Sequence, residues 1–169
     1  LEFKMIDYIK LLIDFYDLEF DKPIEEIEEE FAFESCEIKF VKNSLQILKY
    51  FKQKNYQIIL LSNTSFSTNV VIKMLNKLVN YFDYIIVSRE TVFRKPNKYI
   101  IELGIKLSKN ERKNIYYIGN DYYCDVYGSL NSGINSIWFN EVKNKKNDRL
   151  IVGKYIEISD YNELIDMNF

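Results

Sequence analysis

Residues 115–133 read IYYIGNDYYCDVYGSLNSG, and this stretch decides the fold class. It begins with four apolar residues, turns at Gly119 and then sets out Asn120, Asp121 and Asp125. A short apolar run that ends at turn residues is typical of a strand buried inside a sheet. The two carboxylates therefore stand four residues apart, directly after a buried strand.

The same alternation of strand and helix fills most of the chain. An α/β fold with a doubly wound, mostly parallel sheet follows, because strands that alternate with helices form βαβ units. Three further helices precede these units, the second with Asp21 as its cap candidate and Pro23 in its first turn. We expect a helical segment at 1–40 and an α/β core at 41–169. The patterns predict strands at 56–61, 84–88, 115–119, 135–139 and 154–159, and helices at 3–19, 21–31, 44–54, 67–79, 97–107, 122–132 and 160–167.

Composition excludes several classes of function. With 47% hydrophobic residues, 28% charged residues and a net charge of −2, the 169-residue chain is typical of a globular domain without the basic surplus of nucleic-acid binders. It has neither an apolar run of about 20 residues nor a signal-peptide pattern, so no membrane association is expected. Its two cysteines form no CxxC pair, and we expect reduced thiols and a cytoplasmic protein. The acidic run at 25–30 favours the solvated face of a helix, and the basic run at 143–149 a solvated loop.

The chain contains no histidine. This absence excludes Ser-His-Asp and Cys-His catalysis, histidine-ligated zinc and a histidine proton shuttle. Any acid–base chemistry must therefore use carboxylates, lysine or tyrosine.

Polar residues follow three of the predicted strands. Ser62, Asn63 and Thr64 follow the first, Lys95 lies beyond the second, and the acidic pair follows the third. The carboxyl ends of parallel strands share one edge of a sheet, where ligands bind. Each residue alone is explained as a helix cap or a surface side chain. Together they predict a phosphate site, with hydroxyls and amides for oxygens and a lysine for charge.

The acidic pair indicates a metal. Like charges one helical turn apart repel, and a divalent cation would relieve the repulsion between Asp121 and Asp125. Oxygen ligands without histidine suit Mg²⁺ better than zinc.

As a set, the segments IILLSNTS, RKPN and IYYIGNDYYCDVYGSLNSGI resemble, in order and spacing, the second, third and fourth signatures of the haloacid dehalogenase-like hydrolases. The resemblance covers about residues 41–140. It implies that Ser62 binds the transferring phosphoryl group and that Lys95 neutralises that group and the nucleophile. It also implies that Asp121 and Asp125 hold or orient Mg²⁺. Most relatives place an aspartate directly after the glycine of the fourth signature, whereas Asn120 stands there in this chain, which leaves two candidates for direct metal contact.

The resemblance also implies a first signature, a DxD at the end of the first strand, whose first aspartate is the nucleophile. The nearest candidate is Asp14 in LLIDFYD, but its surroundings have helical periodicity and Tyr16 replaces the second aspartate. We expect the first strand to lie upstream of Leu1. Its absence would leave a gap in the sheet between the strands at 56–61 and 115–119. An N-terminal segment, a second protomer or direct closure of the two strands would fill it.

Three functions follow from these patterns. The first is a Mg²⁺-dependent phosphatase for a small phosphorylated metabolite, with the N-terminal helices as the cap that selects substrate; this chain alone would be inactive. The second is a non-catalytic phosphate-binding or regulatory domain, and the third is an α/β domain whose rim residues are caps. A dehalogenase would need no metal, and the acidic pair favours metal.

Overall fold

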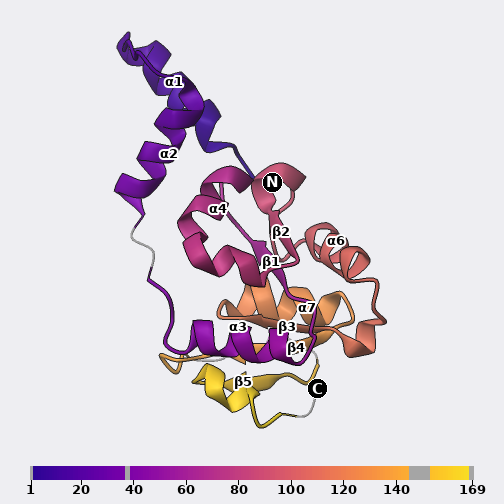
Figure 1. Cartoon of the computed structure of the whole chain (residues 1–169). Coiled ribbons are helices and arrows are strands. Elements are labelled where there is room, and N and C mark those ends of the chain that lie inside the picture. Colours follow the sequence, from indigo (N-terminus) through magenta and orange to yellow (C-terminus); the bar gives the residue numbers. More distant parts are fainter. Residues whose placement is uncertain (1, 37–38, 145–152, 168–169) are drawn as a thin grey trace.

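The computed structural model describes residues 2–36, 39–144 and 153–167 (Figure 1). Helices and strands alternate from residue 44 onward, as the hydrophobic pattern predicts. The helices are α1 (Met5–Tyr16), α2 (Ile24–Ser35), α3 (Ser44–Gln53), α4 (Thr68–Leu75), α5 (Ser88–Thr91), α6 (Lys98–Ser108) and α7 (Gly128–Asn131). The strands are β1 (Ile59–Ser62), β2 (Tyr84–Val87), β3 (Tyr116–Gly119), β4 (Asn135–Phe139) and β5 (Ile156–Ile158). Four short helical segments complete the fold: η1 (Asn76–Tyr81), η2 (Arg112–Asn114), η3 (Tyr122–Tyr127) and η4 (Tyr161–Leu164).

All strand pairs are parallel, which confirms the predicted α/β class, but they form two sheets. β1 pairs with β2 in a two-stranded sheet, and β3, β4 and β5 form a three-stranded sheet in that order. Among the described residues β1 and β3 do not pair with each other, so direct closure of the two strands does not occur.

Helix α6 packs against both sheets. Its buried Ile101 and Ile105 belong to one apolar cluster with Ile86 of β2, and Leu61 of β1 and Tyr117 of β3 pack against that cluster. A second cluster covers the three-stranded sheet, where Ile47 of α3 meets buried side chains from β4, β5 and η4. Helices therefore cover opposite faces of the three-stranded sheet, and α6 holds the two sheets side by side.

The first two helices form a pair that projects from the α/β core (Figure 1). A small apolar cluster joins the pair to the core, in which Ala32 of α2 meets Phe66 and Val70. Large apolar side chains such as Leu11 and Phe15 remain exposed on α1. No helix of the described chain is long and apolar enough to cross a membrane.

Several local predictions need correction. The strand predicted from residue 56 starts at Ile59, and its four residues are only half-buried because β2 is its only strand neighbour among the described residues. Pro23, rather than Asp21, occupies the N-cap position of α2. The final helix is a single 3₁₀ turn, η4, and the predicted helix at 67–79 ends at Leu75 and continues as η1.

The acidic run at 25–30 differs from expectation, and the basic run at 143–149 lies mostly outside the described residues. Within the acidic run, Glu28 is 1% exposed and bonds Arg89 instead of facing solvent. Because an α-helix has about 3.6 residues per turn, successive side chains point in different directions, and that of Glu28 faces the core.

Candidate functional site

The predicted rim residues lie at the carboxyl ends of strands from both sheets. Ser62 is the last residue of β1 and Gly119 the last of β3, while Lys95 lies between α5 and α6. The two sheets thus present their strand ends toward one site, as parallel strands with a common direction must.

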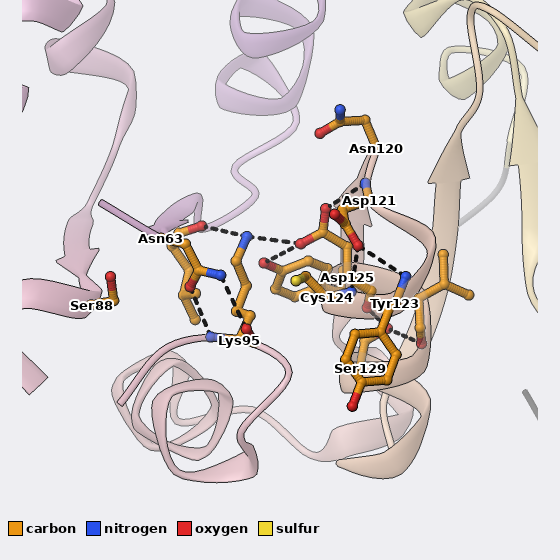
Figure 2. Close-up of polar contacts among 12 residues, drawn as sticks. Asn63, Ser88, Lys95, Asn120, Asp121, Tyr123, Cys124, Asp125 and Ser129 are labelled. Atoms are coloured by element: carbon orange, nitrogen blue, oxygen red, sulfur yellow. Dashed lines mark hydrogen bonds and ion pairs between the residues drawn. The ribbon is translucent and has the colours of Figure 1, made fainter. Parts of the chain in front are cut away.

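Lys95 joins the two halves of this site. Its Nζ lies 2.8 Å from Oδ1 of Asp125, and it also donates to the Leu61 carbonyl at 3.3 Å (Figure 2). The two charged side chains are 12% and 5% exposed, respectively. This contact shows that a lysine within the chain itself relieves the charge of Asp125.

Asp125 is a fully satisfied buried carboxylate. Besides Lys95, its oxygens accept hydrogen bonds from the Tyr117 hydroxyl at 3.3 Å and the Asp121 backbone N–H at 2.9 Å. A Cβ on Gly119 would meet the Asp125 carboxyl carbon at 2.3 Å. The carboxylate lies so close to the end of β3 that only glycine fits at position 119. This close approach explains why a glycine stands between the strand and the acidic pair.

Asp121 is exposed and caps the helical segment that follows. Its Oδ1 accepts hydrogen bonds from the backbone N–H groups of Tyr123 and Cys124, at 2.9 Å and 2.6 Å. The segment it caps, η3, is a π-helix that α7 continues, and not the α-helix predicted at 122–132. Asp121 and Asp125 are therefore not one α-helical turn apart, and the repulsion predicted for that spacing does not apply.

Asn120 is exposed as well. Its side chain points away from the Lys95–Asp125 pair (Figure 2), and its backbone carbonyl accepts a hydrogen bond from Trp138 Nε1 at 3.1 Å. That bond fixes the backbone immediately before Asp121. The side chains of Asn120 and Asp121 therefore both face the solvent side of the rim.

The Asn63 side chain is bound to the backbone of Lys95. Its Oδ1 accepts from the Lys95 N–H at 2.7 Å, and its Nδ2 donates to the Lys95 carbonyl at 3.1 Å (Figure 2). Asn63 thus positions the lysine, and both of its amide functions are occupied.

Thr64 and Ser62 differ in how they are held. The Thr64 N–H donates to Ser88 Oγ at 2.8 Å, and the Thr64 hydroxyl accepts from the Phe66 N–H at 3.2 Å. The Ser62 hydroxyl has no hydrogen-bond partner within residues 2–36, 39–144 and 153–167. Ser62 is therefore the rim hydroxyl that remains available to a ligand.

Two groups at the site have raised pKa values. Burial and the neighbouring charge of Asp125 raise the pKa of the Tyr117 hydroxyl well above its ordinary value, so it stays a hydrogen-bond donor. Burial and the nearby Asp121 carboxylate raise the pKa of the Cys124 thiol. A thiol that keeps its proton at neutral pH is a poor nucleophile. The site is therefore suited to holding an anion and a cation rather than to thiol chemistry.

A magnesium ion fits this donor set only in part. Asp121 already accepts two backbone N–H groups with Oδ1, and Asp125 is committed to Lys95. In the described part of the chain, no cluster of three acidic, cysteine or histidine residues could enclose a metal. Mg²⁺ needs near-octahedral oxygen coordination, so further ligands would have to come from water, substrate or another segment.

The alternative nucleophile, Asp14, is exposed within α1. That helix belongs to the pair that projects from the core (Figure 1). The helical periodicity around Asp14 predicted this outcome.

Sequence patterns missed the supporting residues. Tyr117 stands two residues before Gly119, so its side chain lies on the same face of β3; this spacing was the available signal. Trp138 of β4 gave no signal, because only the pairing of β3 with β4 brings it to Asn120.

Comparison with known families agrees with this geometry. The family model of haloacid dehalogenase-like hydrolases matches residues 2–139. This chain belongs to that family. The match includes the helical pair as well as Ser62, Lys95 and Asp121.

Two curated relatives are, by name, a nucleotidase and a phosphatase. The chain is 31% identical over 64 residues to the pyrimidine 5'-nucleotidase YjjG of Escherichia coli (strain K12), a match that covers 37% of this chain and 28% of the relative. It is 28% identical over 103 residues to a glyceraldehyde 3-phosphate phosphatase of Methanothermobacter thermautotrophicus, covering 58% of this chain and 43% of the relative. The matches thus span less than half the length of these curated relatives.

Two solved structures share the fold. A HAD phosphatase from Thermococcus onnurineus superimposes with a TM-score of 0.69 and 22% identity, covering 92% of this chain and 67% of that one. The HAD-hydrolase YfnB from Bacillus subtilis, described as bound to magnesium, gives a TM-score of 0.66 and 15% identity, covering 92% and 87%. At these identities the likeness establishes the fold alone.

Proposed function

We propose that this chain supplies the phosphate- and metal-binding half of a Mg²⁺-dependent phosphatase that acts on a small phosphorylated metabolite in the cytoplasm. The observation that carries the proposal is the Lys95–Asp125 contact of 2.8 Å at the shared strand ends. A buried cation beside an available hydroxyl is the arrangement that a phosphoryl group requires.

Each rim residue has a proposed role. Ser62 donates a hydrogen bond to a phosphoryl oxygen, and Lys95 neutralises the charge of that group. Asn63 fixes the lysine through its backbone, and Thr64 shapes the loop and offers its hydroxyl to the anion.

Asp121 is the direct metal ligand in this proposal, with Asn120 beside it. Asp125 orients the site from behind, because both of its oxygens already accept hydrogen bonds. A bound Mg²⁺ supplies charge that stabilises the transferring phosphoryl group.

The nucleophile comes from a segment that occupies the gap between the two sheets. β1 and β3 each have one strand neighbour among the described residues, and all eight of their residues are only half-buried. An extended segment in the gap would pair with both strands and remove these open edges. We propose an N-terminal segment, or one from a second protomer, that ends in a DxD at the rim.

Turnover of p-nitrophenyl phosphate with Mg²⁺ tests this proposal. The 169-residue chain is expected to be inactive, and the same chain fused at its N-terminus to an apolar strand that ends in DxD is expected to gain activity. Lys95→Met in the fusion should abolish that activity. Turnover by the unfused chain that Asp14→Asn removes would instead assign the nucleophile to α1.

A non-catalytic phosphate-binding or regulatory domain is the second candidate. It is favoured by the fact that both described acids of the rim are already used, Asp121 as a cap and Asp125 as the partner of Lys95. This candidate predicts that inorganic phosphate binds to the chain and that the fusion stays inactive. The activity of the fusion distinguishes the two candidates, and calorimetric titration of phosphate, with Ser62→Ala as the matched variant, tests the binding site that both share.

A further inference from the structure

Helix α5 binds the helical pair at two points that are far apart in sequence. Its first residue, Ser88, donates to Glu2 Oε2 at 2.6 Å, just before α1 begins. Its second residue, Arg89, pairs with Glu28 of α2, and the two side chains are 10% and 2% exposed. Two adjacent residues of the core thus hold two carboxylates, one just before α1 and one within α2.

The Ser88 hydroxyl also holds the loop that follows β1. Ser88 is completely buried, and its Oγ lies 2.8 Å from the Thr64 nitrogen and 3.1 Å from the Thr64 carbonyl oxygen. Figure 2 shows Ser88 apart from the Lys95–Asp125 pair, on the far side of Asn63. It therefore acts on the rim only through the loop.

A hydroxyl has one proton, so it can donate to only one of its two acceptors at a time. The Glu2 carboxylate is the stronger and nearer acceptor, since bonds to ionised oxygens are shorter and stronger than bonds to carbonyls. While the Ser88 hydroxyl donates its hydrogen bond to Glu2, its oxygen accepts a hydrogen bond from the Thr64 N–H. The orientation of one hydroxyl is thereby set by the segment that leads into α1.

Glu2 itself is firmly held. Its side chain is 3% exposed, Arg94 approaches it at 3.7 Å, and its backbone N–H donates to the Val92 carbonyl at 2.8 Å. A second backbone bond, from Met5 N–H to the Ser65 carbonyl at 2.9 Å, ties the start of α1 to the same loop. Two neighbouring residues of the loop, Thr64 and Ser65, are therefore linked to the segment that leads into α1.

We propose that Ser88 is a positioning residue that couples the placement of the helical pair to the conformation of the loop at 62–65, through the chain of contacts Glu2–Ser88–Thr64. This proposal rests on the proposed function only in naming that loop as the anion-binding loop. Movement of the helical pair away from the core must break the hydrogen bond between Ser88 and Glu2. The Ser88 hydroxyl then rotates to donate to the Thr64 carbonyl, and its hydrogen bond from the Thr64 N–H weakens.

Amide hydrogen exchange with the variants Ser88→Thr and Ser88→Val tests the coupling. Threonine and valine add the same bulk to this buried position and differ only in the hydroxyl, so steric effects cancel between them. We expect exchange at the Thr64 amide to be about tenfold faster or more in Ser88→Val than in Ser88→Thr. Exchange in β4 should be equal in the two. Equal exchange at Thr64 would overturn the proposal.

Glu2→Ala supplies the second half of the test. It should accelerate Thr64 exchange in the Ser88→Thr background and have no further effect in the Ser88→Val background, because the hydroxyl that transmits the effect is gone. Additive effects in the two backgrounds would show that Glu2 and Ser88 act separately, and would overturn the coupling.

Titration with inorganic phosphate separates this proposal from the proposed function. If phosphate binds, Ser88→Val should weaken its affinity about tenfold relative to Ser88→Thr; equal affinities would show that the loop is not the anion-binding element. If no variant binds phosphate but the exchange difference persists, the proposed function fails and the coupling stands.

Discussion

The two sheets carry complementary halves of one site and differ in how they are built. The β1–β2 half provides Ser62, Asn63 and Lys95, which suit an anion, and its apolar side chains pack mainly on α6. The β3–β4–β5 half provides Asp121 and Asp125, and its central strand β4 is buried at four of five residues. The half with more strands has the more complete core, whereas β1 and β3, which flank the gap, are only half-buried.

The comparison shows that the burial of a parallel strand depends on having a strand on each side. A parallel strand is normally covered on both faces and paired on both edges. Strand β4, which is paired on both edges, meets this requirement and has Ile137 at 0% exposed, whereas β1 and β3 are half-buried along their whole length. The interaction that spans the rim is then a polar one, between Lys95 and Asp125, while α6 provides the apolar connection.

Removing Lys95 should produce the largest loss of stability. Lys95→Met leaves Asp125 charged and buried with only two of its three donors, and breaking such a pair costs about 3–5 kcal/mol. The double variant Lys95→Met/Asp125→Leu should recover part of that loss. Urea unfolding of the single and double variants measures the coupling, and strictly additive losses would mean that the pair does not join the two halves.

Truncation of a core residue in the two-stranded half should destabilise the whole chain. Ile86→Ala removes a side chain that packs on α6, and comparable truncations cost about 2–5 kcal/mol. Trp138, the single tryptophan, reports on the three-stranded half. We expect its fluorescence and the far-UV circular dichroism to show one common midpoint. Two separate midpoints would show that the halves unfold independently despite α6.

A side chain at Gly119 should disturb the acid half alone. The Cβ of Gly119→Ala would lie 2.3 Å from the Asp125 carboxyl carbon, and overpacking of this kind costs about 1–3 kcal/mol. The matched control is Gly104→Ala, where the nearest atoms are 3.7 Å away in ordinary contact. Because position 104 lies within α6, alanine there should be neutral or stabilising. An equal loss at both positions would mean that the Asp125 contact does not determine the cost.

Acid should lower the stability of the fold through a different carboxylate in each half, and these losses should be the smallest of those predicted. Burial alone would raise the pKa of Asp83, but hydrogen bonds from Lys52 and the Ile58 N–H outweigh it and lower that pKa below 3.8. Backbone hydrogen bonds from Ser159 and Asp160 lower the pKa of Glu163 below 4.5 in the other half. Depressed folded-state pKa values stabilise the fold above the unfolded value, and that stability is lost as pH falls through the folded value.

The measurement is urea unfolding between pH 6 and pH 2.5. Glu163→Gln should flatten the loss of stability below about pH 4.5, and Asp83→Asn should flatten it below about pH 3.8. The curves of these variants should run parallel to that of the wild type above pH 5. An unchanged slope in either variant would contradict the corresponding carboxylate's contribution.

Much of the architecture was predictable from the sequence because it depends on local patterns. Apolar runs of strand length, such as NSIWF at 135–139, and the helical period of 97–107 gave elements that differ from the structure by a residue or two. The spacing of Ser62, Lys95 and Asp121 after successive strands predicted the common rim, because parallel strands must end on the same side.

Other features depended on contacts between distant segments, which local patterns do not record. Glu28 stands in an acidic run typical of a solvated surface, and it is buried only because Arg89 from α5 lies opposite. The split of the sheet between β1 and β3 could be expected only from a family resemblance, because no residue within either strand signals a missing neighbour.

The sequence by itself determined the strand-to-helix alternation, the absence of histidine chemistry and the set of side chains at the rim. Tertiary structure alone decided that Asp125 pairs with Lys95 and that Asn63 holds the lysine backbone. The physical reason is that composition and periodicity fix which groups reach an edge. The partners of Lys95 and Asn63 at that edge come from segments 30 or more residues away, which only the packing of the chain brings within hydrogen-bond distance.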